Sequence, residues 1–453
     1  MVSSREREGQ FDADVGEAAL DAIMRWDEWI HRRVESVHPL DGDRGRIRHS
    51  IDCSPPGDAR LAYDPRDRRR RLGRIDGSAM VPLAFVTKGP MRHLDTAGHD
   101  GAPLTLLTMR ENLEISVSAL SWGLTREGLA VNETVRGALR ELVGPDGPAL
   151  QADLEALLAE GTWRDVVLWP GGALSPELSD LLRDLSRNFL LTVLVPATQL
   201  GRRQVVKFSF HWAVRPLARR DRVRRPLAAL GLTTLTLDIP MMNPADAESY
   251  HLEFRTPPEL ACVSLRLEGS SSAAATDTSG EPVAHAHGAF DNAHDSVAKV
   301  ELRVRRQGAW RVTWAATGLT AVVSTAAVAL PGASAVLRDA GNGGPAILLA
   351  APALLIGLAS ARSESSLSSW LLTPLRFVNV AMALGLFAMA GSIVGDLISP
   401  LNDILWGAVA AAATTAFVTL SFGHRLMSTT ARPKRYPDRH TDDPTRGAAH
   451  DAS

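Results

Sequence analysis

The stretch AWRVTWAATGLTAVVSTAAVAL, residues 309–330, is the first of several apolar runs near the C-terminal end of this 453-residue chain. Between residues 309 and 424 only eight of 116 side chains are charged, whereas the other 337 residues contain 92 charged side chains. The first density, about 7%, suits a lipid environment, and the second, about 27%, is usual for a soluble surface. The sequence therefore excludes a wholly soluble protein.

Four apolar runs approach the roughly 20 residues that a helix needs to cross a bilayer. They are residues 310–330, 345–361, 377–398 and 404–422. The second run is short and contains Pro352, and the last two are separated only by the turn-forming SPLND of residues 399–403, which indicates an antiparallel hairpin. We predict an all-α bundle of four transmembrane helices within residues 309–424. Small residues such as those in GAVAAAA, 407–413, suit close helix packing and self-association into a homo-oligomer.

The orientation of these spans follows from the flanking basic residues, because cytoplasmic loops accumulate Arg and Lys. Basic residues are dense before the first span and after the last one, with Arg303, Arg305 and Arg306 on one side and Arg432, Lys434 and Arg435 on the other. We therefore expect a multi-pass protein of the inner (plasma) membrane with both termini in the cytoplasm. Residues 1–15, which contain no apolar signal sequence, and the basic tail 425–453 are expected to be disordered. In that compartment Cys53 and Cys262 are expected to be reduced.

Residues 16–187 are expected to form a mixed cytoplasmic region. Apolar residues at helical spacing, among them Ile23, Ile30 and Val34, predict an amphipathic helix over residues 17–38 that ends at Pro39. Short apolar runs between turn signals predict strands within 45–107. Thr108 followed by Glu111 is a capping box, which predicts the first of several helices within 108–187.

Residues 188–308 show strict alternation of apolar and polar side chains. Examples are VVKFSFHW at 205–212, YHLEFR at 250–255 and VAKVELRV at 297–304. A period of two with one wet face is typical of antiparallel sheet. About seven strands in about 120 residues match the scale of a β-sandwich. The predicted fold class is thus α+β, with a β-sandwich-like domain just before the membrane helices; whether its strands share a sheet with those of 45–107 stays open.

One group of residues in this region could hold a metal. His285 and His287 are two apart and would face one side of a strand, and Asp291, His294 and Asp295 follow closely. Cys262 is not at a zinc-motif spacing, and low-complexity sequence precedes the group. The interpretation favoured here is a solvated strand edge and loop.

Two arginine-rich segments, RDRRRRLGR at 66–74 and RPLARRDRVRR at 215–225, could contact anionic lipid headgroups. Interleaved Asp67 and Asp221 weaken that interpretation, and a solvated loop is favoured over lipid contact. Nucleic acid is not expected as a partner, because the net charge is −2 and no aromatic stacking platform accompanies the arginines.

A third polar group, His93, Asp95, His99 and Asp100 around Gly98, is interpreted as a hairpin tip in which Asp and Gly serve the turn. No phosphate-binding glycine loop, nucleophile elbow or Cys–His pair at a familiar spacing occurs. We therefore assign no catalytic, cofactor-binding or metal-ligating residue and do not expect an enzyme.

Two segments carry a resemblance to other proteins. VPLAFVTKGPMRHLDTAGHDGAPLTLLTMREN at 81–112 and SYHLEFRTPPEL at 249–260, followed by the apolar runs, resemble uncharacterised actinomycete membrane proteins with four spans. The predominance of Arg over Lys, of which there are four, agrees with such an origin. The resemblance implies the architecture and no activity.

The sequence thus favours a membrane-anchored cytoplasmic scaffold, adaptor or sensor with an unknown protein partner and the lipid bilayer as its surroundings. The alternatives are a small-solute transporter or channel component, which would need a polar path, and a metal-dependent hydrolase, which would need a zinc site with a general base.

Overall fold

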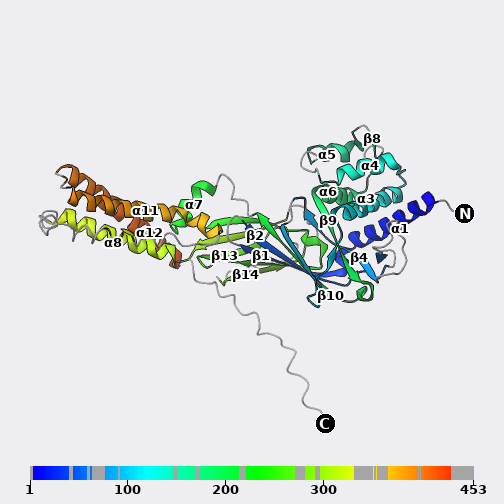
Figure 1. The fold of residues 1–453 in the computed structure, drawn as a ribbon, viewed down its shortest axis with the longest axis horizontal. Coiled ribbons are helices and arrows are strands. Elements are labelled where there is room, and N and C mark those ends of the chain that lie inside the picture. The colour runs from blue at the N-terminus through cyan, green and yellow to red at the C-terminus, as the bar shows by residue number, and fades with distance from the viewer. Residues whose placement is uncertain are drawn as a thin grey trace, which may run out of the picture. The chain divides into compact units, whose positions relative to one another are not determined.

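The computed structural model of the chain (Figure 1) describes residues 4–39, 44–58, 62–63, 77–89, 92–145, 151–164, 166–169, 174–213, 221–270, 281–290, 296–330, 350, 353–354, 366–395, 397 and 399–429. The chain divides into two compact units. The first contains residues 1–218, 236–302 and 363–370, and the second contains 219–235, 303–362 and 371–453. The first unit holds the sheets, and the second holds most of the apolar helices.

The first unit begins with two helices, α1 (Ser4–Met24) and α2 (Trp26–Trp29), which are followed directly by strand β1 (Ile30–Pro39). The expectation of one helix over residues 17–38 is therefore wrong beyond residue 29. Ile30, Val34 and Val37 fit a helical spacing, but β-branched side chains also favour strands, and the alternating burial of Arg33, Glu35 and Val37 has the period of a strand.

The largest sheet has six strands in the order β14-β12-β1-β2-β10-β5. Their bounds are β14 Val283–Gly288, β12 Ser249–Arg255, β2 Arg44–Cys53, β10 Gln204–Ala213 and β5 Arg92–Ala97. β1 pairs with β12 in parallel, and the other pairs are antiparallel. We call this the six-stranded sheet.

A sandwich confined to 188–308 and built from antiparallel strands is therefore the wrong description. The alternating pattern predicted that β10 and β12 are strands, but a period of two carries no information about which strand lies beside them or in which direction. β1, β2 and β5, from the first hundred residues, fill those places. The two strand-rich stretches thus share their sheets.

The remaining described strands form three smaller sheets. One has the order β3-β4-β9-β6, with bounds Ala62–Tyr63, Ser78–Thr87, Asn188–Pro196 and Thr105–Leu106. Another has the order β11-β15-β13, with bounds Leu235–Pro240, Val297–Val304 and Leu260–Leu267. The third pairs β7 (Thr162–Trp163) with β8 (Val166–Val167). Short 3-10 turns occur at η2 (Ala197–Gln199) and η3 (Pro244–Asp246).

The helical segment between the two strand-rich stretches is confirmed. It consists of α3 (Met109–Arg126), α4 (Glu133–Leu142), α5 (Gln151–Glu160) and α6 (Pro176–Arg187). The predicted capping box opens α3, because the Thr108 side chain accepts from the Glu111 backbone while the Glu111 carboxylate accepts from the Thr108 backbone.

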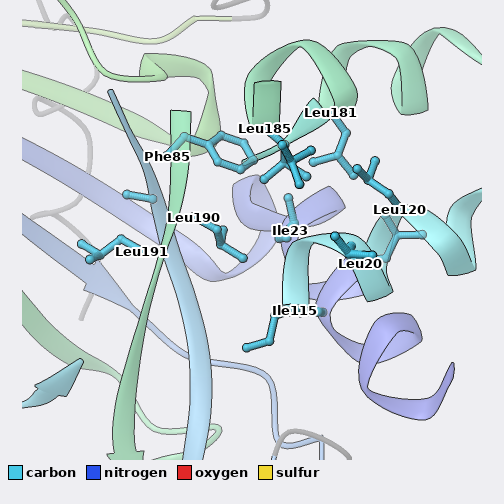
Figure 2. Close-up of a cluster of buried hydrophobic side chains, with 14 of the residues drawn as sticks. Leu20, Ile23, Phe85, Ile115, Leu120, Leu181, Leu185, Leu190 and Leu191 are labelled. Atoms are coloured by element: carbon cyan, nitrogen blue, oxygen red, sulfur yellow. The ribbon is translucent and has the colours of Figure 1, made fainter. Parts of the chain in front are cut away.

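The core of the first unit lies between α1, α3 and α6 and the strands β4 and β9. Figure 2 shows the side chains that meet there: Leu20, Ile23, Phe85, Ile115, Leu120, Leu181, Leu185, Leu190 and Leu191. α1 and α3 approach so closely that a Cβ on Gly16 would lie 2.3 Å from the Ser118 carbonyl oxygen. The N-terminal helix is therefore a core element that packs on its own domain.

The second unit contains α8 (Ala309–Ala329), most of α11 (Ser366–Val394), α12 (Leu401–Thr429) and α7 (Asp221–Ala229). The described residues include three helices long and apolar enough to cross a membrane, Ala309–Ala329, Leu367–Val394 and Leu401–Gly423. The predicted span 345–361 lies almost entirely outside the described residues. At the expected hairpin, Trp406 Nε1 donates to Ser392 Oγ over 2.8 Å and joins the end of α11 to the beginning of α12.

Candidate functional site

The six-stranded sheet has two chemically different faces. On β1 the side chain of Arg32 is 52% exposed, whereas that of its neighbour Arg33 is 1% exposed. The same alternation continues through β2, where Arg48 is exposed and His49 is buried, because successive residues of a strand point to opposite faces. We call the two sides the buried face and the outer face. Each carries a group of ionisable side chains.

The buried face contains a polar cluster of Arg33, Glu35, His49 and Tyr250, which we call the buried cluster. The cross-strand register places Tyr250 beside Arg33 and His49 beside Glu35. The Tyr250 hydroxyl donates to Glu35 Oε2 over 2.6 Å. His49 Nδ1 lies 3.9 Å from the same oxygen. Glu35 is therefore the centre of the cluster.

Arg33 extends from the cluster to two backbone carbonyls. Its Nη2 donates to the Leu83 oxygen over 3.1 Å, and its Nη1 donates to the Met242 oxygen over 3.3 Å. The Leu83 carbonyl is available because the register of β4 with β9 shifts between Pro82 and Ala84, and such a bulge leaves a residue outside the ladder. Arg33 thus satisfies a carbonyl that a proline-containing bulge in a different sheet leaves unpaired.

Burial decides the charge state of this cluster. It raises the pKa of Glu35 to about 7, although the hydrogen bond from Tyr250 acts in the opposite direction. Burial lowers the pKa of His49 to about 3, and the positive charge of Arg33 adds to this effect. Asp246, whose Oδ2 lies 3.8 Å from Arg33 Nη1, also has its pKa raised to about 7 by burial. The cluster therefore holds a neutral imidazole and exchanges carboxyl protons near neutral pH.

The chemistry of the buried cluster is internal to the fold. Among the described residues, Arg33 Nε, Glu35 Oε1 and His49 Nε2 are buried and have no hydrogen-bond partner. The His49 ring stacks on Phe208 and Phe210, with ring centroids 4.5 Å and 5.8 Å away. These side chains are therefore closed off from solvent.

The outer face carries a second group, His251, His285 and His287, which we call the histidine cluster. His251 on β12 lies directly opposite His287 on β14, and His285 is two residues before His287. His251 Nδ1 lies 3.2 Å from His285 Nε2. The three ring centroids are 5.3, 5.5 and 5.9 Å apart. Burial lowers the pKa of His251, and the two neighbouring imidazoles lower it further.

Only two residues of the metal group considered from the sequence, His285 and His287, can be compared with this cluster. His285 and His287 share one face, as the spacing indicates, and His251 of β12 lies beside them. Asp291, His294 and Asp295 lie outside the described residues. Cys262 is buried on β13. Within the described part of the chain, no three His, Cys, Asp or Glu side chains already converge as a metal-binding group.

The arginine-rich segments are seen only at one end. Residues 66–74 and 215–220 lie outside the described residues, and residues 221–225 form the beginning of α7. Arg224 is exposed, and Arg225 is partly buried. The turn after α7 packs on the end of α12, where a Cβ on Gly423 would lie 2.3 Å from the Leu230 oxygen. Gly423 is also the last residue of the candidate membrane span Leu401–Gly423, so the turn that follows α7 lies at one end of that span.

The third polar group contains a turn, but the expected hairpin tip is wrong, because β5 pairs with β10 whereas β6 pairs with β9 in a different sheet. Asp100 Oδ1 accepts from the Ala102 backbone over 2.9 Å, and Gly101 has a positive φ of 81°. The His93 ring lies beside that of His211 on β10, with centroids 4.4 Å apart and ring planes inclined by 43°. Asp95 lies 3.7 Å from Arg46 on the outer face.

The apolar helices use their polar side chains locally. Thr313, Thr317, Thr320 and Ser324 form a fully buried line along α8. The hydroxyls of Thr317 and Ser324 donate to backbone oxygens one turn earlier in the same helix. This pattern is typical of packed helices.

Sequence reasoning missed Arg33, Glu35, His49 and Tyr250 as a group. Arg33 and Glu35 lie in the segment 17–38 that the sequence predicts as an amphipathic helix, and charged side chains there are expected to face solvent. One signal could have found them: Arg33 and Glu35 are two residues apart in a segment rich in β-branched side chains, and this spacing puts both on one face of a strand.

No family model matches the chain, and no curated protein is significantly similar to it.

Proposed function

We propose that the protein is a membrane-anchored adaptor or sensor whose six-stranded sheet presents its outer face to a protein partner. The observation that carries this proposal is the chemistry of that face. Its exposed residues Arg32, Arg48, Lys207 and Arg255 come from four different strands. Acidic residues are fewer there, and Asp52 is already engaged by Arg203 over 2.8 Å. A partner with an acidic surface would complement this face.

The membrane anchor in this proposal comprises four spans, with residues 345–361 as the second. Three apolar helices support the anchor, and the basic residues outside the first and last spans support cytoplasmic termini. A phosphatase reporter fused after residue 453 tests this topology. An inactive reporter there and an active one placed between residues 331 and 344 are expected, and activity at the C-terminus would contradict an even number of spans.

Anionic lipid is the second proposed partner, through the arginines of residues 215–225. The support is the position of α7, whose following turn packs against the end of the candidate span at Gly423. Arginines at that level lie where headgroups occur, and each contributes about 1 kcal/mol near an anionic surface. Homo-oligomerisation through the small-residue helix faces remains part of the same proposal.

Site-specific photo-crosslinking in native membranes tests the adaptor role. A photoreactive side chain replaces Lys207 on the outer face, and the control replaces Arg110, an exposed residue of α3. We expect a discrete adduct from position 207 whose yield falls with added salt, and none from position 110. The same adducts from both positions, or none from position 207, would contradict a binding role for the outer face.

A further inference from the structure

The histidine cluster brings three imidazoles from two adjacent strands to one patch of the outer face. β14 is an edge strand of the six-stranded sheet, and His285 and His287 on it are exposed. Side chains two apart on a strand share a face, and residues directly opposite on neighbouring strands have Cβ atoms about 5 Å apart. This backbone arrangement places the three Cβ atoms close together on one face of the sheet.

The distances agree with those of a metal centre. A tetrahedral ion with metal–nitrogen bonds of about 2.0–2.1 Å separates its ligand nitrogens by about 3.3 Å. His251 Nδ1 and His285 Nε2 are already 3.2 Å apart. A hydrogen bond between them uses one ring proton, and a metal ion bound by both nitrogens would replace that proton and lie off the line that joins them.

The third ring is within reach of the same point. The His287 centroid lies 5.5 Å from that of His251 and 5.9 Å from that of His285. The rings are inclined by only 24–30°, so they stack instead of converging. Convergence on one ion therefore requires rotation of the His285 and His287 side chains, both of which are exposed.

Two neighbouring side chains supply the support that metal-ligating histidines usually have. Ser249 Oγ lies 3.0 Å from His251 Nε2, which orients Nδ1 of that ring toward His285. Glu253 pairs in register with His285, and its Oε2 accepts from Ser36 Oγ over 2.6 Å. A held carboxylate beside the rings offsets the charge of a bound cation.

We infer that His251, His285 and His287 form a binding site for a borderline divalent cation of the Zn²⁺, Ni²⁺ or Cu²⁺ class, which imidazole nitrogens favour. The remaining coordination position is open to water or to a donor from outside the chain. This inference deepens the proposed function, on which it rests for the role of the outer face, because it names a ligand for that face. Metal binding is nevertheless measured without a partner, so its failure and the failure of partner crosslinking are separate results.

The test uses the purified full-length protein in detergent, made metal-free and without a histidine tag. Titration with Co²⁺ reports tetrahedral coordination by its visible absorption, and titration with Zn²⁺ by calorimetry gives the stoichiometry. We expect one ion per chain and a rise in the unfolding temperature with Zn²⁺ concentration, because a ligand that binds only the folded state stabilises it.

Variants assign the binding to this cluster. The double variant His285→Ala/His287→Ala is expected to lose the stoichiometric Co²⁺ spectrum, and Ser249→Ala is expected to weaken Zn²⁺ about 10-fold. His99→Ala, which removes an exposed histidine of the 98–102 turn, is the matched control and is expected to bind as the wild type does. No saturable binding by the wild type, or equal binding by the double variant and the wild type, would overturn the inference.

Discussion

Arg32 and Arg33 are neighbours on β1, but the sheet gives them opposite environments. Arg32 lies on the outer face, and the nearest oxygen of Asp52 is 3.8 Å away. Arg33 lies on the buried face and donates to two carbonyls. The difference teaches that charge on this sheet has two uses. On the buried face it links separate elements of the fold, and on the outer face it is available to other molecules.

The largest effect is expected from removing the buried arginine. Arg33→Ala leaves the Leu83 and Met242 carbonyls without their donor and leaves Glu35 and Asp246 without a nearby cation. We expect a loss of about 3–5 kcal/mol in the free energy of unfolding, measured by urea denaturation of the detergent-solubilised protein. Arg32→Ala, on the outer face, is the control and is expected to cost less than about 1 kcal/mol. Equal losses would contradict the distinction between the faces.

The second effect concerns pH. Because the folded-state pKa of Glu35 is raised to about 7, the folded protein binds this proton more tightly than the unfolded chain does. The stability from Glu35 is thus fully present below the ordinary pKa of about 4.5 and is lost as the pH rises to about 7. Glu35→Gln removes this pH-dependent contribution. Between pH 4.5 and 8 the free energy of unfolding of the variant should therefore rise relative to that of the wild type by on the order of 3 kcal/mol.

His49 acts in the opposite direction and has to be separated from Glu35. Its lowered pKa gives stability that increases as the pH rises from about 3 to 6.5. Comparing Glu35→Gln with the wild type at each pH largely cancels this contribution, since both proteins retain His49. A difference between the two unfolding free energies that does not change with pH would contradict a raised pKa of Glu35.

A smaller effect is expected from Tyr250. Tyr250→Phe removes the hydroxyl that donates to Glu35 Oε2 and leaves a buried carboxyl oxygen with less support. A cost of about 1–3 kcal/mol is expected at neutral pH. The pKa of Glu35 should rise further, because the lost hydrogen bond favoured the carboxylate. His251→Ala, one residue later on the outer face, should change metal-free stability by no more than about 0.5 kcal/mol, and a comparable loss there would contradict this assignment.

The same two faces show what the sequence could predict. Alternation predicted β10 and β12 correctly, because one wet face gives a clear period of two. The capping box at Thr108 predicted the beginning of α3, because it depends only on residues close in sequence. β1 was mistaken for helix, since its buried face contains Arg33 and Glu35, and charged residues at buried positions make the pattern look helical.

The candidate sites depend on contacts that a local pattern does not contain. His285 and His287 were recognised as a pair, but their third neighbour is His251, which precedes His285 by 34 positions. Glu35 and Tyr250 are separated by 215 positions and meet through the parallel pairing of β1 with β12. Strand order decides both groups. It follows from the packing of the whole unit, and single-sequence periodicity does not report it.

The smallest effect is expected from an ion pair on the outer face. Arg203 donates through two nitrogens to the two Asp52 oxygens, at 2.9 and 2.8 Å, but its own side chain is 66% exposed. Arg203→Ala should therefore cost less stability than any of the buried-face variants, and the cost should fall further as salt increases. The hydrogen bond from Arg203 lowers the pKa of Asp52, so this stability exists above the ordinary pKa of the carboxyl and is lost as the pH falls through the lowered one. Unfolding curves at two salt concentrations measure the difference. A cost that equals that of Arg33→Ala and does not respond to salt would mean that the outer face also has a structural role.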